Sequence, residues 1–159
     1  LGDFARGVVD PPSFVAGGQR VAPNICYEDL FGEELAHRFA DAATAPTVLA
    51  NLSNIGWFGD TVATVQHLNI SRLRALEFQR PMIRATNTGA TAIIDHRGTV
   101  AAMLPPHTRG VLEGRVQGRE GITPYAWWTA RAGLWPLVLA AGLALLPAVR
   151  RAVRRPRPA

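Results

Sequence analysis

Residues 20–31 read RVAPNICYEDLF, and the mainly apolar first half of this stretch leads to the single cysteine of the chain, Cys26. The part from Arg20 to Ile25 has the composition of a β-strand that leads directly into Cys26. A sharp turn after a strand can present a side chain to a pocket while a following backbone N–H faces an oxyanion. Cys26 is therefore the candidate nucleophile, and the alternative is a small buried hydrophobe, the commoner role of a lone cysteine.

Strand-like and helix-like segments alternate after Cys26, which predicts an α/β fold with layers of helix and sheet. Further strands are expected at Thr47–Leu52, Met82–Thr86, Thr91–Asp95, Thr99–Met103 and Val111–Val116. Helices are expected at Gly32–Ala43 and Thr61–Arg80, the second ending before Pro81. On that second helix Val62, Val65, Leu68, Leu73 and Leu76 recur near one face.

The C-terminal part contains an uncharged stretch of 18 residues, 132–149. As a helix it would span roughly 27 Å, close to the hydrocarbon core of a bilayer. Three tryptophans stand near its start: Trp127, Trp128 and Trp135. The stretch predicts a transmembrane helix with a cytoplasmic C-terminus, because basic residues follow it. A buried core helix is the alternative, since the stretch is short and contains Pro136 and Pro147.

The formal charge of +5 is concentrated at the C-terminus. Five of the 17 basic residues lie within 150–159, and the remaining 12 are matched by 12 acidic residues. A tail of this kind does not indicate a nucleic-acid-binding surface. All 17 basic residues are Arg, and the chain begins with Leu1 rather than Met, so we expect a piece of a longer protein.

The acidic residues Glu28 and Asp29 follow Cys26 closely and would disfavour its thiolate. The sequence has no Lys, and no Arg is close to Cys26 in sequence. Either Cys26 is inert, or an activating cation comes from an upstream segment. A dyad of Cys26 with His67 stays open. The spacing of the four histidines, His37, His67, His96 and His107, matches no metal site, so neither a metal nor a cofactor is expected.

Four segments carry a family resemblance: NICYEDLFGEE, NLSNIGWFGDT, QHLNISRLRALEFQRPMIRATNTGATAIID and GITPY. They resemble the bacterial apolipoprotein N-acyltransferases, whose catalytic domain belongs to the nitrilase (carbon–nitrogen hydrolase) superfamily. The resemblance covers nearly all of residues 20–149. It implies the C-terminal part of a nitrilase-like αββα sandwich at 1–125, an aromatic belt and transmembrane helix at 126–149, and a basic cytoplasmic tail at 150–159. With the upstream half of the sheet absent, we expect an unpaired edge beside Arg20–Ile25.

The resemblance also implies a Glu–Lys–Cys triad. Cys26 matches the nucleophile, Glu28 matches a supporting acid, and Tyr27 and Trp57 match residues that contact the substrate. The Glu and Lys of the triad belong to an earlier part of that domain and are not matched here. From the residues alone, Trp57 could instead be a core side chain.

The implied reaction transfers a fatty acyl chain from a phospholipid to Cys26 and then to the N-terminal amine of a diacylglyceryl-cysteine on a lipoprotein. The implied location is the bacterial inner membrane, with the catalytic domain in the periplasm and the C-terminus in the cytoplasm. The expected partners are the phospholipid donor, the diacylated lipoprotein acceptor and the membrane, with no nucleic acid. Two alternatives stay open: a membrane-tethered amidase or nitrilase-type hydrolase, and a non-catalytic anchored module.

Overall fold

The computed structural model describes residues 7–8 and 11–153, and six strands in it form one sheet in the order β1-β2-β3-β4-β5-β6. The strands are β1 (Phe14–Ala16), β2 (Gln19–Ile25), β3 (Val48–Ser53), β4 (Met82–Thr86), β5 (Ala92–Ile94) and β6 (Val100–Met103). Strands β2, β3 and β4 are parallel, and the other neighbours are antiparallel. The carboxyl ends of the three parallel strands therefore lie at one edge of the sheet, where α/β proteins commonly bind ligands.

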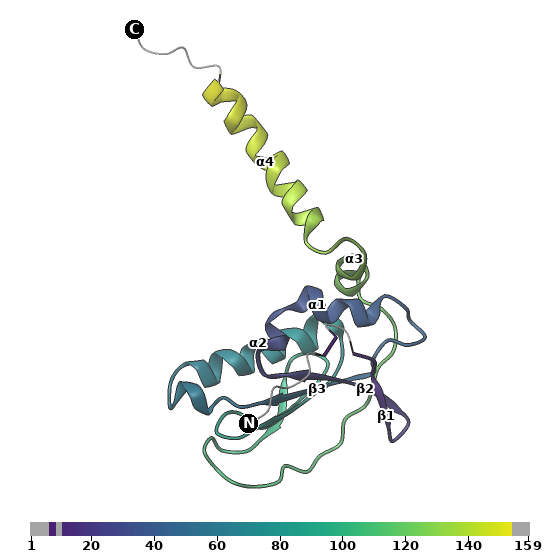
Figure 1. The fold of residues 1–159 in the computed structure, drawn as a ribbon, viewed down its shortest axis with the longest axis vertical. Helices are drawn as coiled ribbons and strands as arrows, with labels where there is room; N and C mark the ends of the chain where they lie inside the picture. The colour runs from purple at the N-terminus through teal and green to yellow at the C-terminus, as the bar shows by residue number, and fades with distance from the viewer. Residues whose placement is uncertain (1–6, 9–10, 154–159) are drawn as a thin grey trace.

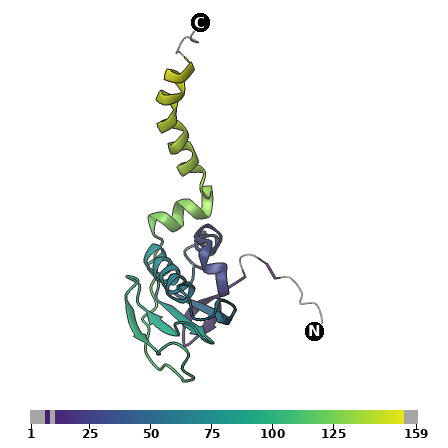
Figure 2. The same ribbon diagram turned by 90° about the vertical axis from the view of Figure 1, so that its left-hand side faces the viewer.

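Helices cover one face of this sheet (Figures 1 and 2). They are α1 (Gly32–Ala36), α2 (Ala63–Phe78) and α3 (Pro124–Ala132), with short 3-10 helices η1 (Cys26–Leu30), η2 (His37–Phe39) and η3 (Gly56–Phe58). Phe39 stacks on Phe78 with ring centroids 4.6 Å apart, and Phe78 meets the ring of Tyr125 edge-on at 5.6 Å. These rings pack against Leu49 and Met82 of the sheet and form the hydrophobic core.

The ends of these helices follow from local sequence. Helix α2 stops at Gln79, whose φ of 52° is left-handed, and Pro81 two residues later cannot continue a helix. Helix α3 begins at Thr123, whose hydroxyl accepts a hydrogen bond from the N–H of Ala126 at 3.1 Å. It ends at Gly133, where φ is 54°. Helix α4 (Trp135–Val153) follows at once.

Two of the expected elements are wrong. Residues 111–116 do not form a strand, and they line a cavity with Ile83 and Ile93 on the face of the sheet opposite α2. The expected helix at 32–43 is α1 followed by η2, and it ends at Phe39. The unpaired edge expected beside Arg20–Ile25 is covered in part: the hairpin through Gly17 and Gly18 returns β1 to pair with residues 19–21 of β2, and among the described residues no strand pairs with 22–25 on that side. The strand at Met82–Thr86 has the expected bounds, and the other expected strands and the long helix differ from the structure by no more than two residues at either end.

The apolar face expected for α2 points outward instead of into the core. Val62, Val65, Leu73 and Leu76 are exposed. The buried side chains of α2 are His67, Ser71, Arg74, Ala75 and Phe78. The face of the sheet opposite α2 also carries exposed apolar residues, Ile25, Leu52 and Ile83. Both of these exposed surfaces lie on the α/β body that contains Cys26.

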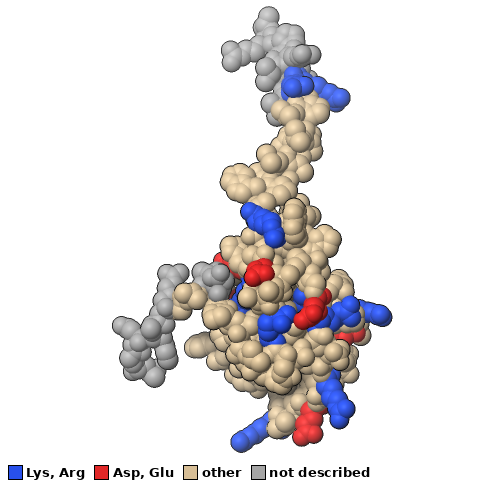
Figure 3. All heavy atoms as spheres, turned by 90° about the vertical axis from the view of Figure 1, so that its right-hand side faces the viewer, with Lys and Arg blue, Asp and Glu red and all other residues tan. Residues whose placement is uncertain are grey.

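Helix α4 projects away from the α/β body (Figure 1). Its described side chains from Trp135 to Pro147 are all exposed, so it is not the buried core helix that the sequence left open. Figure 3 shows it as a rod of uncharged atoms with basic residues near both ends. Of the tail arginines, Arg150 and Arg151 are described, whereas Arg154, Arg155 and Arg157 lie outside the described residues.

The transmembrane helix expected at 132–149 is not confirmed. No single helix within residues 7–8 and 11–153 combines the length and the apolar composition that crossing a bilayer requires. Helix α3 and residues 135–147 of α4 meet both criteria only as a pair, and the two axes are bent by 88° at the break between them.

Candidate functional site

A row of polar residues crosses the three parallel strands near their carboxyl ends. Asn24 of β2 is in register with Asn51 of β3, which is in register with Arg84 of β4. All three side chains are buried on the face that α2 covers. Asn51 Nδ2 donates to Asn24 Oδ1 at 2.5 Å, so the first two members of the row are joined across the sheet. It forms the floor of the site, directly below the turn that begins at Cys26.

Cys26 has a left-handed backbone, with a φ of 52°. A non-glycine residue in this conformation costs on the order of 1–3 kcal/mol and persists only where neighbouring groups hold it. Two side chains contact its carbonyl oxygen: Asn51 Nδ2 at 2.9 Å and His67 Nε2 at 3.2 Å. The thiol is partly exposed and lines a cavity, so Cys26 is not the buried hydrophobe of the alternative reading.

The two predicted neighbours of Cys26 lie at the surface. Glu28 Oε2 accepts a hydrogen bond from the N–H of Ile25 at 2.6 Å, which closes the turn from β2 into η1. Glu28 therefore supports the backbone around Cys26 rather than facing the thiol through a free carboxylate. The side chain of Tyr27 is 64% exposed, and it lines the same cavity as Cys26.

Asp29 is the acid of this segment that the structure buries, and sequence reasoning gave it no role beyond its charge. Its carboxylate is completely inaccessible to solvent. Oδ1 lies 3.0 Å from His67 Nε2, and Oδ2 accepts from Ser71 Oγ at 2.5 Å. Arg84 lies 3.7 Å from the same carboxylate and donates to Ser71 Oγ. The spacing of His67 and Ser71, four residues apart on one helix face, was the available clue.

The hydrogen-bond partners of His67 determine where its ring proton lies. Nε2 faces two acceptors, the Cys26 carbonyl and the Asp29 carboxylate, so Nε2 carries the proton. Nδ1 lies 3.2 Å from Arg84 Nη2, which can only donate, so Nδ1 is the acceptor. The basic lone pair of the ring therefore points at Arg84. This geometry opposes the Cys26–His67 dyad that the sequence left open.

Arg84 is the cation that the local sequence around Cys26 lacks. Burial lowers the pKa of its guanidinium, and the charges of Asp29 and Cys26 oppose that shift. The guanidinium is engaged by Asp29, Ser71 and the His67 ring. Strand β4 brings this guanidinium to the site from a position 58 residues after Cys26 in the sequence. That an activating cation for Cys26 comes from an upstream segment stays a prediction.

The cavity beside Cys26 has a volume of about 260 Å³ and mostly apolar walls. Leu30, Ile55, Phe58 and Ile70 contribute to these walls. Trp57 does not line it. Its side chain is 83% exposed, so Trp57 is not a core residue. Phe58, the neighbouring aromatic of η3, is the one that meets the cavity.

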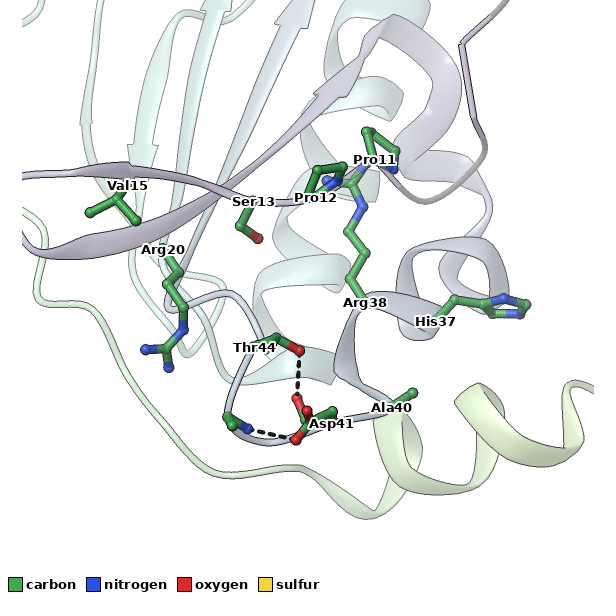
Figure 4. Close-up of a pocket in the computed structure, with 11 residues that line it drawn as sticks. Pro11, Pro12, Ser13, Val15, Arg20, His37, Arg38, Ala40, Asp41 and Thr44 are labelled. Carbon is green, nitrogen blue, oxygen red and sulfur yellow. Dashed lines mark hydrogen bonds between the residues drawn. The ribbon is translucent and has the colours of Figure 1, made fainter.

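A larger cavity of about 510 Å³ lies elsewhere, between the segment leading into β1 and the turn after η2 (Figure 4). It is lined by Pro11, Pro12, Arg20, His37 and Asp41 among others. The turn is held by Asp41, which accepts a hydrogen bond from the N–H of Ala43 at 2.9 Å. This cavity shares no lining residue with the one beside Cys26. In the described part of the chain, no three His, Cys, Asp or Glu residues are grouped as a metal site would require.

Comparison with known proteins adds a family to this geometry. The carbon-nitrogen hydrolase family model matches residues 4–125. The chain is 67% identical over 84% of its length to an apolipoprotein N-acyltransferase of Verminephrobacter eiseniae, and 54% identical over 95% to one of Ralstonia nicotianae. It spans 26% and 28% of the lengths of those two relatives, about a quarter.

A solved structure supports the same fold. The carbon-nitrogen hydrolase from Helicobacter pylori superposes with a TM-score of 0.60 at 14% identity. The superposition covers 86% of this chain and 50% of that protein. At this identity the likeness concerns the fold alone.

Proposed function

The chain belongs to the carbon–nitrogen hydrolase family, and from that premise we propose that it contributes the nucleophile of an apolipoprotein N-acyltransferase. The observation that carries the proposal is the position of Cys26, on a left-handed turn at the edge of the parallel sheet and at the wall of an apolar cavity. The names of its relatives, apolipoprotein N-acyltransferases, support the choice of reaction.

In the first half-reaction the Cys26 thiolate attacks the ester carbonyl carbon of a phospholipid. The ester C–O bond breaks, a lysophospholipid leaves with a proton, and the acyl chain remains on Cys26 as a thioester. Apolar residues such as Leu30 and Phe58 are suited to contact the chain and to keep water from the thioester.

In the second half-reaction the α-amine of a diacylated lipoprotein attacks the thioester carbonyl. The C–S bond breaks, an amide forms, and the proton lost by the amine restores the Cys26 thiol. Glu28 and Asp29 are engaged with Ile25 N and with the His67–Ser71–Arg84 group, so we assign neither as the base. The Glu and Lys that the family resemblance implies would supply the base and an oxyanion partner from outside these residues.

Membrane attachment is part of this proposal because both substrates are lipids. Helix α4 exposes apolar side chains on its described length, and Arg150 and Arg151 follow them. We propose that α4 enters the inner membrane with its basic end toward the cytoplasm, which leaves Cys26 on the periplasmic side. The exposed face of Ile25, Leu52 and Ile83 would then be covered by the second sheet of an αββα sandwich.

The decisive experiment measures acyl transfer by the full-length protein in phospholipid vesicles. Cys26→Ala should lower transfer by at least about 10³-fold, and Cys26→Ser should be nearly as inactive because a hydroxyl is a poorer nucleophile near neutral pH. Mass spectrometry should find the wild-type acyl group on Cys26. Transfer that survives in the Ala variant would remove the nucleophile assignment and favour an anchored module.

The acceptor separates the transferase from the hydrolase alternative. With a diacylated lipopeptide present, the acyl group should appear on the peptide amine faster than as free fatty acid. Release to water at the same rate with and without the lipopeptide, or acylation of Cys26 by small amides but not by phospholipid, would favour a membrane-tethered amidase.

A further inference from the structure

The carbonyl of Cys26 is the one backbone group of the nucleophile that side chains from two other elements contact. Asn51 reaches it from β3 and His67 from α2. A left-handed residue relaxes toward ordinary backbone angles unless its peptide groups are held. Rotation of that peptide would also move the Cβ–Sγ bond, so the two contacts fix the direction in which the thiol points.

The donor on α2, the ring of His67, is itself held in place by neighbouring side chains. Asp29 Oδ1, at 3.0 Å, shares the single Nε2–H of His67 with the Cys26 carbonyl at 3.2 Å. At the other ring nitrogen Arg84 Nη2 donates to Nδ1, and Ser53 Oγ lies 3.5 Å from it. Ser71 joins the two charged groups, since its hydroxyl donates to Asp29 and accepts from Arg84. The exposures of these four side chains are 0% for Asp29, 6% for His67, 0% for Ser71 and 2% for Arg84. With the proton fixed on Nε2, the ring can donate to the Cys26 carbonyl but cannot take the thiol proton.

We propose that His67 is a positioning residue for Cys26, acting as a neutral donor to its carbonyl, and that Asp29, Ser71 and Arg84 hold it in that tautomer. The inference deepens the proposed function and rests on Cys26 as the nucleophile. It assigns different tasks to the two adjacent acids. Glu28 closes the turn through Ile25, and Asp29 orients the histidine beneath it.

The test compares His67→Gln with His67→Leu in the full-length protein. The side-chain amide N–H of Gln can reach the place of Nε2, whereas Leu fills similar space with no donor. Acylation of Cys26 by phospholipid should be about 10²-fold slower in the Leu variant, the scale of a misplaced reacting group. The Gln variant should stay within about tenfold of wild type, because one neutral hydrogen bond is retained. The same pair of changes at the exposed His37 is the matched control and should alter neither rate.

A second readout separates positioning from proton transfer. The pH profile of Cys26 alkylation by iodoacetamide should keep its shape in His67→Gln, because His67 does not accept the thiol proton. An ionisation that disappears from the profile in this variant would identify His67 as the base and overturn the proposal. Equal rates for Gln and Leu at equal melting temperatures would also overturn it, because the donor would then be irrelevant.

If the Leu variant does not fold, Ser71→Ala replaces it, since it removes the hydroxyl that bridges Asp29 and Arg84 and also contacts the His67 carbonyl, while the direct Arg84–Asp29 ion pair stays. This variant should melt as a folded protein and acylate Cys26 several-fold more slowly, and a wild-type rate would refute the proposal. Failure of the proposed function gives a different pattern. Wild-type Cys26 would then not react with phospholipid, while alkylation would still rank wild type and Gln above Leu.

Discussion

Helices α2 and α4 both expose apolar side chains, but the two helices differ in what their remaining faces contact. Helix α2 leaves Val65 and Leu73 exposed and turns His67, Ser71 and Arg74 toward the sheet. Helix α4 exposes its described side chains from Trp135 to Pro147 on every side. The exposed residues of α2 are thus one face of a helix anchored by a polar site, whereas α4 has an apolar surface with no buried face.

The difference teaches that burial in this protein does not follow hydrophobicity alone. Placing His67 and Ser71 next to Asp29 and Arg84 satisfies four buried polar groups together, and this fixes the rotation of α2. As a consequence, Val65, Leu73 and Leu76 lie on the exposed side of α2, while Ala75 and Phe78 near its C-terminal end pack in the core. No such constraint acts on α4, so its apolar composition requires a different environment, which we propose is the bilayer.

The largest expected effect would break the comparison at the buried end of α2. Phe78→Ala removes a fully buried ring that stacks on Phe39, and it should lower the free energy of unfolding by about 3–5 kcal/mol. Trp135→Ala is the control on α4, where the ring is 70% exposed, and should change that free energy by no more than about 0.5 kcal/mol. Denaturant titration followed by circular dichroism measures both. Similar losses in the two variants would mean that α4 packs on the body.

An effect of intermediate size would sharpen the contrast between the two exposed apolar surfaces. Leu143→Asp should disfavour membrane insertion of α4 by about 2.5–3.5 kcal/mol, the cost of an acid at the centre of a spanning helix. Leu73→Asp makes the same change on the exposed face of α2 and should leave the protein in the membrane. Fractionation of washed membranes, with detection by immunoblot, gives the retained fraction. Release by the Leu73 change but not by the Leu143 change would place the bilayer against α2.

The smallest expected effect concerns the exposed aromatic of the body. Trp57→Ala should leave the melting temperature close to wild type, because the ring is 83% exposed. Acylation of Cys26 by phospholipid should slow about tenfold if the ring packs on an acyl chain, and Trp57→Phe should restore part of the rate. A small activated ester should react at the wild-type rate. If the variant unfolds, or loses both reactions equally, Trp57 has no role in guiding the lipid.

The strands and the long helix could be predicted because their signals are local. Residues 82–86 contain the β-branched Ile83 and Thr86 and directly follow Pro81, and the strand there has the expected bounds. Cys26 was found in the same way, from its place at the end of a strand. The strand expected at 111–116 failed because its short mix of apolar and polar residues fits equally well an extended segment that lies over a sheet face without pairing at its edge.

The features of the candidate site likewise separate into those that local sequence predicts and those that it does not. The sequence alone determined the α/β class, the position of Cys26 after a strand, and the uncharged stretch that becomes α4, because each depends on neighbours within a few residues. Only the tertiary structure decided that Asp29 rather than Glu28 is buried, that Arg84 lies against Asp29, and that Phe58 rather than Trp57 meets the cavity. These outcomes depend on the rotation of α2 and on the register of β2, β3 and β4, which bring together residues 38 to 55 positions apart. Periodicity along the chain carries no information on which of two adjacent side chains such an arrangement will bury.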